Sequence, residues 1–333
     1  MRHYGLLKNF IGICFLILAG CGEPPPNAGS GTIALVQTGG QVADSDLLIQ
    51  VAKEFYTTHP DQYDMLVVWS ARELAPGHSF YFPVKNDVPG IGYGNMGEEF
   101  FDASADFGST QLQGIIWMGP DWITNTDHGE GPRSVLGILA QETGHRWAAT
   151  IHFQDPASGT DSSALLEDAY HWNFYLTTGA SPMGGNKWES LGNSLYRALP
   201  VEYVEYCPLD LYLMSLITAR EVTPLQLLVN IHSPGDLSAP PSSKIVSRTT
   251  EPVTVHASVM EIPIDAIIAA EGTRDPAVGF TAKKIRQAWI YVYQDPFELL
   301  HPGLDTLRQL NSQWDDYFSR ATGGRSSMST TLR

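Results

Sequence analysis

Residues 139–147 read LAQETGHRW, and this stretch decides the fold that the sequence predicts. We expect a helix over residues 132–150, because the segment is apolar and opens on a proline, which suits the first turn of a helix. Gln141 and His145 are four positions apart, so a helix projects both side chains from one face, with Glu142 beside them. The helix therefore gathers an amide, a carboxylate and an imidazole in one place.

One substitution separates this stretch from H-E-x-x-H, the pattern of zinc peptidases. In that pattern two imidazoles bind Zn²⁺ and the intervening Glu is the general base. Glu142 keeps the base position and His145 the second ligand position, whereas Gln141 offers a neutral carbonyl oxygen, a poor partner for zinc. We therefore expect zinc binding to be weak or absent. The alternative is an ordinary apolar helix that matches the pattern by chance.

His171 is the candidate for a third metal ligand. It lies among aromatic residues in the segment LLEDAYHWNF, residues 165–174, so the alternative is a packed, hydrogen-bonded histidine. His152 lies on roughly the same helical face as His145. It misses by one position the spacing that the third histidine has in metzincins, and it is the weaker candidate.

The segment YCPLDLYLM, residues 206–214, alternates apolar residues with three others that could serve a metal site. Asp210 is a candidate metal ligand, or a partner that orients a ligating histidine. Tyr212 would stabilise an oxyanion, and Met214 would form the floor of the site. The alternative is an ordinary buried segment with a capped start.

Several motifs together resemble a group of bacterial secreted proteins and lipoproteins of the zincin, or HExxH-type, metallopeptidase kind. Their recurring pattern combines an H-E-L-G-H-R-W helix, an H-W-S-like segment and a D-L-Y-L-M-G-L segment. The chain departs from this pattern at Gln141, at Asn173 in place of Ser, and at Ser215 in place of Gly. The matching residues are Glu142, Gly144, His145, Arg146, Trp147, His171, Trp172 and residues 210–214.

The resemblance implies an α+β, zincin-like metallopeptidase domain over residues 41–325. Its upper lobe, residues 41–152, would hold a mixed sheet with helices and the active-site helix. Residues 153–325 would form the lower lobe, and residues 326–333 a frayed tail.

Apolar periodicity predicts the main elements of these lobes. Pro83 places the second expected strand at a sheet edge. Helices are expected over residues 46–58 and 304–319, and strands over residues 65–69, 79–84, 113–118, 253–264 and 288–293.

The first residues have the pattern of a sorting signal. Residues 1–20 combine a basic start with an apolar run too short to span a membrane, as in a signal peptide. The letters LAGC that end at Cys21 resemble the bacterial lipobox, which implies cleavage and lipidation of Cys21, with palmitate or a similar acyl chain. Residues 21–40 would then be a Pro- and Gly-rich tether, and Gly22 resembles lipoproteins sorted to the outer membrane. The alternative is an ordinary signal peptide.

Composition limits the partners. The chain has 36 acidic and 20 basic residues and a net charge of −16, which argues against nucleic acid as a ligand. Removal of the signal and acylation of Cys21 leave Cys207 as a lone cysteine, which we expect to be a small buried residue.

The sequence therefore predicts a membrane-anchored envelope lipoprotein with a degenerate metallopeptidase site. We interpret it as a pseudoenzyme that binds a peptide or an envelope partner. One alternative is an active zinc-dependent peptidase, with Zn²⁺ held by His145, His171 and either Asp210 or Gln141, and with Glu142 as the general base. The other alternative is a purely structural envelope lipoprotein.

Overall fold

The computed structural model describes residues 32–39, 44–73, 79–125, 127, 129–179, 181–232, 253–278 and 284–333. The predicted signal peptide and Cys21 lie outside these residues. The class is α+β, as predicted. No helix in the described ranges is both long enough and apolar enough to cross a membrane.

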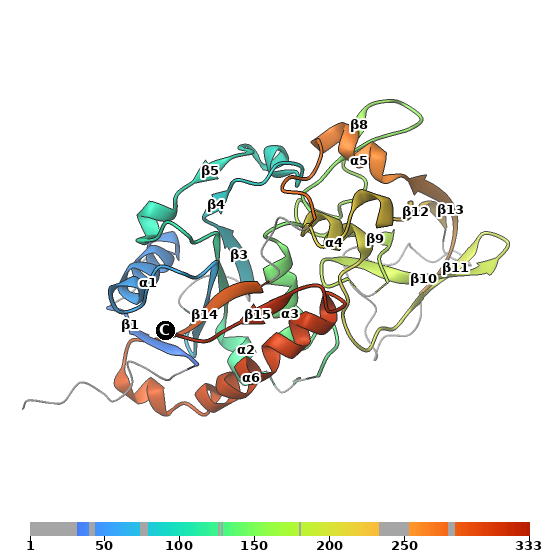
Figure 1. The fold of residues 1–333 in the computed structure, drawn as a ribbon. Helices are drawn as coiled ribbons and strands as arrows, with labels where there is room; N and C mark the ends of the chain where they lie inside the picture. Colours follow the sequence, from blue (N-terminus) through green and yellow to red (C-terminus); the bar gives the residue numbers. More distant parts are fainter. Residues whose placement is uncertain are drawn as a thin grey trace, which may run out of the picture.

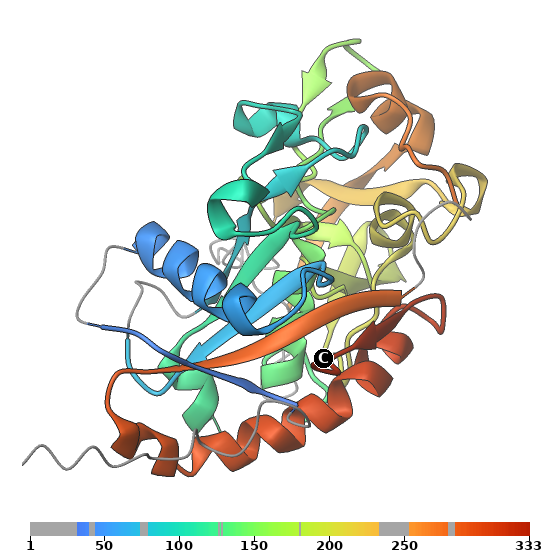
Figure 2. The same ribbon diagram turned by 60° about the vertical axis from the view of Figure 1, so that its left-hand side comes forward.

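One half of the molecule is built on a mixed sheet (Figures 1 and 2). Its strands lie in the order β1 (Ala34–Gln37), β14 (Lys284–Tyr293), β2 (Met65–Ser70), β6 (Gly114–Met118) and β3 (Ser79–Pro83), and β15 (Ser327–Ser329) also pairs with β14. All neighbours are parallel except β3, which runs antiparallel to β6 at the edge, as Pro83 predicts. Every residue of β2 is buried, as expected for a central parallel strand covered on both faces.

Helices cover both faces of this sheet. On one face α1 (Asp44–Thr58) packs its apolar stripe, which includes Val51 and Phe55, against the sheet. The other face is covered by α2 (Pro120–Thr124), α3 (Val135–Gly144) and α6 (Gly303–Ala321). Figure 2 shows the sheet between α1 in blue and α6 in red.

The other half is a small closed barrel, at the right of Figure 1. Its strands follow the order β10 (Gly184–Gly192), β11 (Leu195–Leu199), β13 (Thr254–Ile262), β12 (Leu225–His232) and β9 (Trp172–Thr177). The helices α4 (Pro208–Leu213) and α5 (Ile264–Glu271) lie beside it. The remaining elements are the strand pairs β4 (Lys85–Asn86) with β5 (Phe101–Asp102) and β7 (Phe153–Gln154) with β8 (Asp161–Ser162), and the 3-10 helices Tyr93–Met96, Ser104–Phe107, Ala219–Glu221 and Pro296–Leu300.

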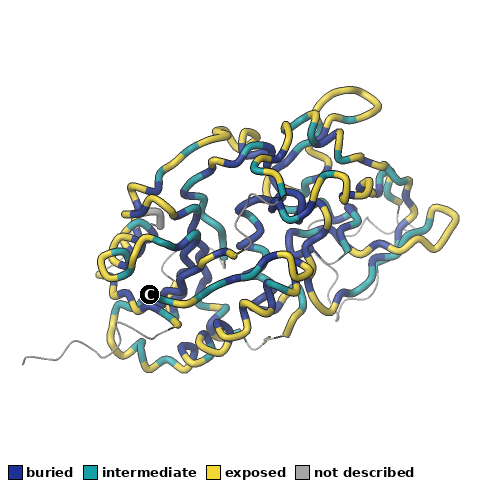
Figure 3. The backbone as a smooth tube through the Cα atoms, viewed as in Figure 1, coloured by how far each residue is buried: buried dark blue, intermediate teal, exposed yellow. Residues whose placement is uncertain are grey.

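The helix α3 lies where the two halves meet. The largest hydrophobic cluster joins residues of the sheet, such as Trp289, to residues of α3, such as Leu139, and of the barrel, such as Leu227. Figure 3 shows buried backbone in dark blue through the interior of both halves, with exposed loops at the periphery. The end of α3 is therefore packed between the sheet half and the barrel half, and residues of both halves can contact its polar side chains.

Three expectations about boundaries are wrong. The α3 helix is shorter than residues 132–150, because the Ser134 hydroxyl caps its start by accepting from the Gly137 N–H at 3.0 Å, and it ends at Gly144. Residues 34–37, which were predicted as part of the tether of residues 21–40, instead form β1 and pair with β14. The predicted frayed tail, residues 326–333, instead forms β15, because Met328 is fully buried and its strand pairs with β14.

The division into two consecutive lobes also fails at the C-terminal end. The predicted strand at residues 288–293 exists within β14, but it pairs with β1 and β2 rather than lying in the lower lobe. The predicted helix at residues 304–319, α6, packs against α2 and α3 on the same sheet. The barrel is thus an insertion between β6 with α3 on one side and β14 with α6 on the other. The other predicted strands and the helix at residues 46–58 are confirmed.

Candidate functional site

The last turn of α3 is fixed from the sheet side. Gln287 of β14 donates from Nε2 to Thr143 Oγ1 at 3.2 Å, and its Oε1 accepts from the Trp314 indole at 2.8 Å. Gln287 and Trp314 are both fully buried, so these bonds are shielded from water. They set the rotation of α3 and hence the direction in which the following polar side chains project.

Four side chains meet at this turn, and we refer to Gln141, Glu142, His145 and His171 as the QETGH cluster. Gln141 Nε2 lies 3.3 Å from His171 Nε2 and 3.4 Å from Glu142 Oε1. The rings of His145 and His171 meet edge to face with centroids 5.1 Å apart. The structure therefore brings together three of the four predicted metal ligands, Gln141, His145 and His171, with the candidate base Glu142.

Glu142 is a buried carboxyl group that is only 3% exposed. Ser79, at the start of the edge strand β3, donates its hydroxyl to Glu142 Oε1 at 3.0 Å. Burial raises the pKa of Glu142 to about 7, although hydrogen bonds from Ser79, the Tyr81 backbone N–H and Gln141 act in the opposite direction. Glu142 can therefore exchange a proton near neutral pH. No sequence pattern indicates Ser79, since its contact with Glu142 depends on how β3 lies over α3.

His145 is neutral in this setting. Burial, and to a smaller extent the neighbouring His171, lower the pKa of His145 to about 3. The 4.0 Å contact between His145 Nε2 and Glu142 Oε2 is therefore not an ion pair at neutral pH.

The tautomer of His171 is set by Asp168. Its Nδ1 lies 2.9 Å from Asp168 Oδ2, so Nδ1 carries the proton and Nε2 presents a lone pair. That lone pair faces Gln141 Nε2, and Glu142 Oε1 is a second acceptor for the same amide group. Because both neighbouring atoms are acceptors, the NH₂ group of Gln141 must face them, and the carbonyl oxygen of Gln141 points away from them.

This arrangement fits Zn²⁺ poorly. The QETGH cluster supplies two imidazoles, and one of them already accepts from Gln141. Catalytic zinc sites use three protein ligands drawn from His, Cys and carboxylates. Within the described ranges no group of three or more such side chains is placed to hold a metal ion.

Asp210 lies apart from this cluster. It is fully buried in the first turn of α4, and burial raises the pKa of its carboxyl group. Its oxygens accept from Trp172 Nε1 at 2.7 Å, Ser181 Oγ at 2.7 Å and Cys207 N at 2.8 Å. These contacts give no support to Asp210 as a metal ligand. It acts as a positioning residue, because Trp172 directly follows His171.

A methionine does lie under the site, but it is Met183 rather than Met214. The Met183 carbonyl accepts from the Trp172 N–H at 2.8 Å, and a Cβ added to Gly144 would lie 2.3 Å from Met183 Sδ. Gly144 is therefore required for this close approach. Met183 was missed because its loop is brought under α3 by contacts between distant segments.

Three other candidates point elsewhere. Met214 lines a separate cavity beside Arg146. Tyr212 does not face the cluster as an oxyanion donor would, because its hydroxyl accepts from the Arg274 backbone N–H at 3.2 Å. His152 donates its backbone N–H to Glu271 Oε1 and lines a surface hollow with Glu167 and Asp168.

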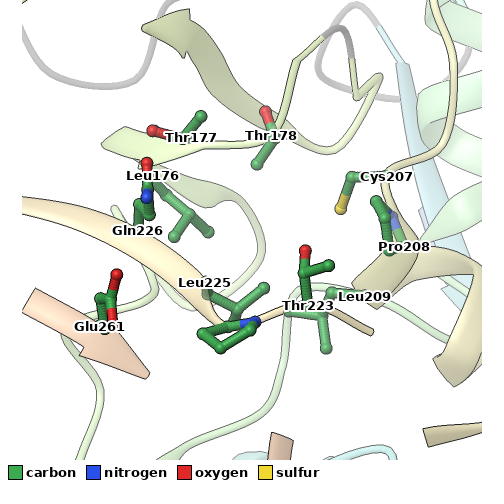
Figure 4. Close-up of a pocket in the computed structure, with 11 residues that line it drawn as sticks. Leu176, Thr177, Thr178, Cys207, Pro208, Leu209, Thr223, Leu225, Gln226 and Glu261 are labelled. Atoms are coloured by element: carbon green, nitrogen blue, oxygen red, sulfur yellow. The ribbon is translucent and has the colours of Figure 1, made fainter. Parts of the chain in front are cut away.

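A cavity of about 310 Å³ lies between β9, β12 and the start of α4 (Figure 4). Its walls combine Leu176, Thr178 and Leu225 with the thiol of Cys207, and none of the QETGH cluster lines it. Cys207 is a buried free cysteine, as predicted, and burial together with the nearby Asp210 raises the pKa of its thiol well above the usual range. The thiol is therefore not an activated nucleophile.

Comparison with known proteins identifies no relative: no protein-family model, no curated protein and no solved structure matches this chain.

Proposed function

We propose that this protein is a lipid-anchored envelope protein whose zincin-like domain has become a pseudoenzyme that binds a peptide or an envelope partner. The observation that carries the proposal is the 3.3 Å contact between Gln141 Nε2 and His171 Nε2. A hydrogen bond occupies the lone pair that a metal would need.

The glutamine at position 141 affects two of the ligands that a zinc site would need. It removes one imidazole, and its amide group engages the imidazole that remains at His171. Zinc binding would have to break this contact and rotate the amide, and it would gain only a neutral oxygen in return. We therefore assign the QETGH cluster no metal-dependent step.

The edge strand supports a peptide as the bound partner. β3 ends the sheet, and Ser79 at its start contacts Glu142. An edge strand pairs with extended peptides through those of its backbone groups that have no other partner; on β3 the Tyr81 N–H already donates to Glu142. A peptide added along β3 would pass beside the QETGH cluster.

An active zinc peptidase is the second candidate, and the pKa of about 7 at Glu142 favours it. A carboxylate that titrates near the working pH suits a general base.

A peptidase assay separates these two candidates. We expect purified protein to leave a peptide library uncut, with and without added Zn²⁺, and Glu142→Gln to behave identically. Glu98→Gln, an exposed change, is the matched control. Zinc-dependent cleavage that is lost in Glu142→Gln but kept in Glu98→Gln would establish the peptidase.

Localisation has its own test, because it rests on residues 18–21. Cys21→Ser removes the acylated thiol, so we expect the variant to leave the membrane fraction. If the variant fractionates with membranes as the parent does, the lipobox interpretation is wrong.

A further inference from the structure

A second polar region lies just past the end of α3. It is a cavity of about 270 Å³, which we call the arginine cavity because Arg146 and Arg274 line it. Asp64 and Lys284 also line it, at the amino ends of β2 and β14, so it lies at the amino edge of the parallel strands, against the end of α4. None of the QETGH cluster lines it.

Arg146 is a buried cation whose charge is only partly offset by a carboxylate. It is 1% exposed, and it donates from Nε to Gln113 Oε1 at 2.9 Å and from Nη1 to Asn86 Oδ1 at 3.0 Å, both neutral acceptors. Its carboxylate partner is Asp87, 3.5 Å from Nη2. The Asp87 side chain is 62% exposed and is shared with Lys85, so it offsets the charge of Arg146 only in part.

Arg274 is a second buried cation, 3% exposed, and carbonyl oxygens are its acceptors. Its Nε donates to Leu213 O at 2.6 Å, and its Nη1 donates to the carbonyls of Asp275 and Pro276. In the part of the chain that the structure describes, no carboxylate lies within ion-pair distance of Arg274, although the charges of Asp275 and Asp87 act on it. Burial, and then the charge of Arg146, lower the pKa of Arg274 to about 10.

Two guanidinium groups held this way are costly in the absence of a counter-ion. Buried charges are retained in proteins when an opposite charge pairs with them. Three cations, Arg146, Arg274 and Lys284, and two carboxylates, Asp64 and Asp87, line the cavity. The two carboxylates repel a dianion such as phosphate more strongly than a monoanion.

We propose that the arginine cavity binds a small organic monoanion, a carboxylate that carries an apolar group. The carboxylate would lie between the guanidinium groups of Arg146 and Arg274, which match its planar geometry. The apolar group would pack on the remaining wall, to which Trp147, Leu216 and Ile285 contribute. A volume near 270 Å³ is on the order of nine water molecules, enough for one aromatic or short aliphatic acid.

Benzoate tests the charge requirement on the unaltered, detergent-solubilised full chain by isothermal titration calorimetry. Benzamide has the same shape without the charge, and phenyl phosphate is a dianion. We expect benzoate to bind at least about tenfold more tightly than benzamide, since hydrogen bonds to charged groups exceed neutral ones by this order. We also expect it to bind more tightly than phenyl phosphate. Equal affinity for benzoate and benzamide, or no binding of benzoate, would overturn the proposal.

Arg274→Gln tests the position of the ligand. We expect benzoate affinity to fall at least about tenfold, while the exposed Arg308→Gln on α6 retains the parent affinity. Lys284→Gln, an exposed change at the cavity that is expected to fold, should weaken benzoate but not benzamide. Parent-like benzoate affinity in both Arg274→Gln and Lys284→Gln would place the anion elsewhere and contradict the proposal.

Discussion

The QETGH cluster and the arginine cavity lie on either side of one short helix end, and their polar groups are satisfied in opposite ways. In the cluster, the amide of Gln141 engages His171, the Ser79 hydroxyl engages Glu142, and His145 is neutral. In the arginine cavity, Arg146 and Arg274 remain charged and buried with mostly neutral partners. In the QETGH cluster the amide and the carboxyl group are thus paired, whereas in the arginine cavity two buried guanidinium groups share one partly exposed carboxylate partner, Asp87.

Among the substitutions considered, we expect Asp210→Ala to lower the free energy of unfolding the most. The change leaves the Trp172 indole N–H, the Ser181 hydroxyl and the Cys207 N–H without their acceptor in a dry environment. We expect the free energy of unfolding to fall by roughly 3–5 kcal/mol, the sum of such unsatisfied groups. Urea unfolding followed by tryptophan fluorescence measures it, with the exposed Asp305→Ala as control. A loss below about 1 kcal/mol would show that Asp210 does not hold the His171 segment in place.

Glu142→Gln tests how much the buried carboxyl group destabilises the folded protein when it ionises. The pKa of Glu142 is about 7 in the folded protein against an ordinary value of 4.5 in an unfolded chain, so the folded state holds the proton more tightly. Stability from this group is present below about pH 4.5 and is lost as the pH rises to about 7, in total about 3 kcal/mol. The glutamine has no charge to bury, so the variant should be more stable than the parent at pH 8 and similar near pH 4.5.

Urea unfolding at several pH values between 4.5 and 8 measures this difference. The exposed Glu98→Gln should follow the parent at every pH. If Glu142→Gln keeps the parent's pH slope, the carboxyl is solvated and the cluster is more open than described above.

Gln141→His restores the imidazole that the motif lacks. It would remove the amide that engages His171 Nε2 and offer a third nitrogen beside His145. We expect a zinc-dependent gain of about 2.7 kcal/mol at zinc concentrations 100-fold above Kd, read as a rise in Tm. The exposed Gln309→His on α6 is the control and should show no such rise. An unchanged Tm for Gln141→His would mean that more of the ligand set than Gln141 has been lost.

Local pattern was enough to predict several parts of the fold. The apolar run in β2, the edge position implied by Pro83 and the stripe of α6 each depend on residues close in sequence. The strands that pair with β14 were not predicted. Its apolar sequence is compatible with any buried strand and does not indicate which sheet it joins. Similarly, nothing local indicates that Met328 completes the core.

The candidate site divides in the same way. Helical spacing predicted that Gln141 and His145 share a face, and His171 was a candidate because His171 and Trp172 match the H-W segment of the resemblance. Ser79 and Met183 could not be predicted, since ordinary residues acquire these roles only through packing of distant segments. The other candidates in residues 206–214 were misplaced because their spacing was read without knowing that α4 turns Asp210 toward Trp172.

Zinc content of the parent protein tests the central claim most directly. Full-length protein is dialysed against excess Zn²⁺ and then against metal-free buffer, and the bound metal is measured by atomic emission. Because Gln141 engages His171 and supplies no third imidazole, we expect far less than one zinc per chain, unchanged in His145→Ala. About one zinc per chain, lost in both His145→Ala and His171→Ala, would contradict the account and restore a metal centre at the QETGH cluster.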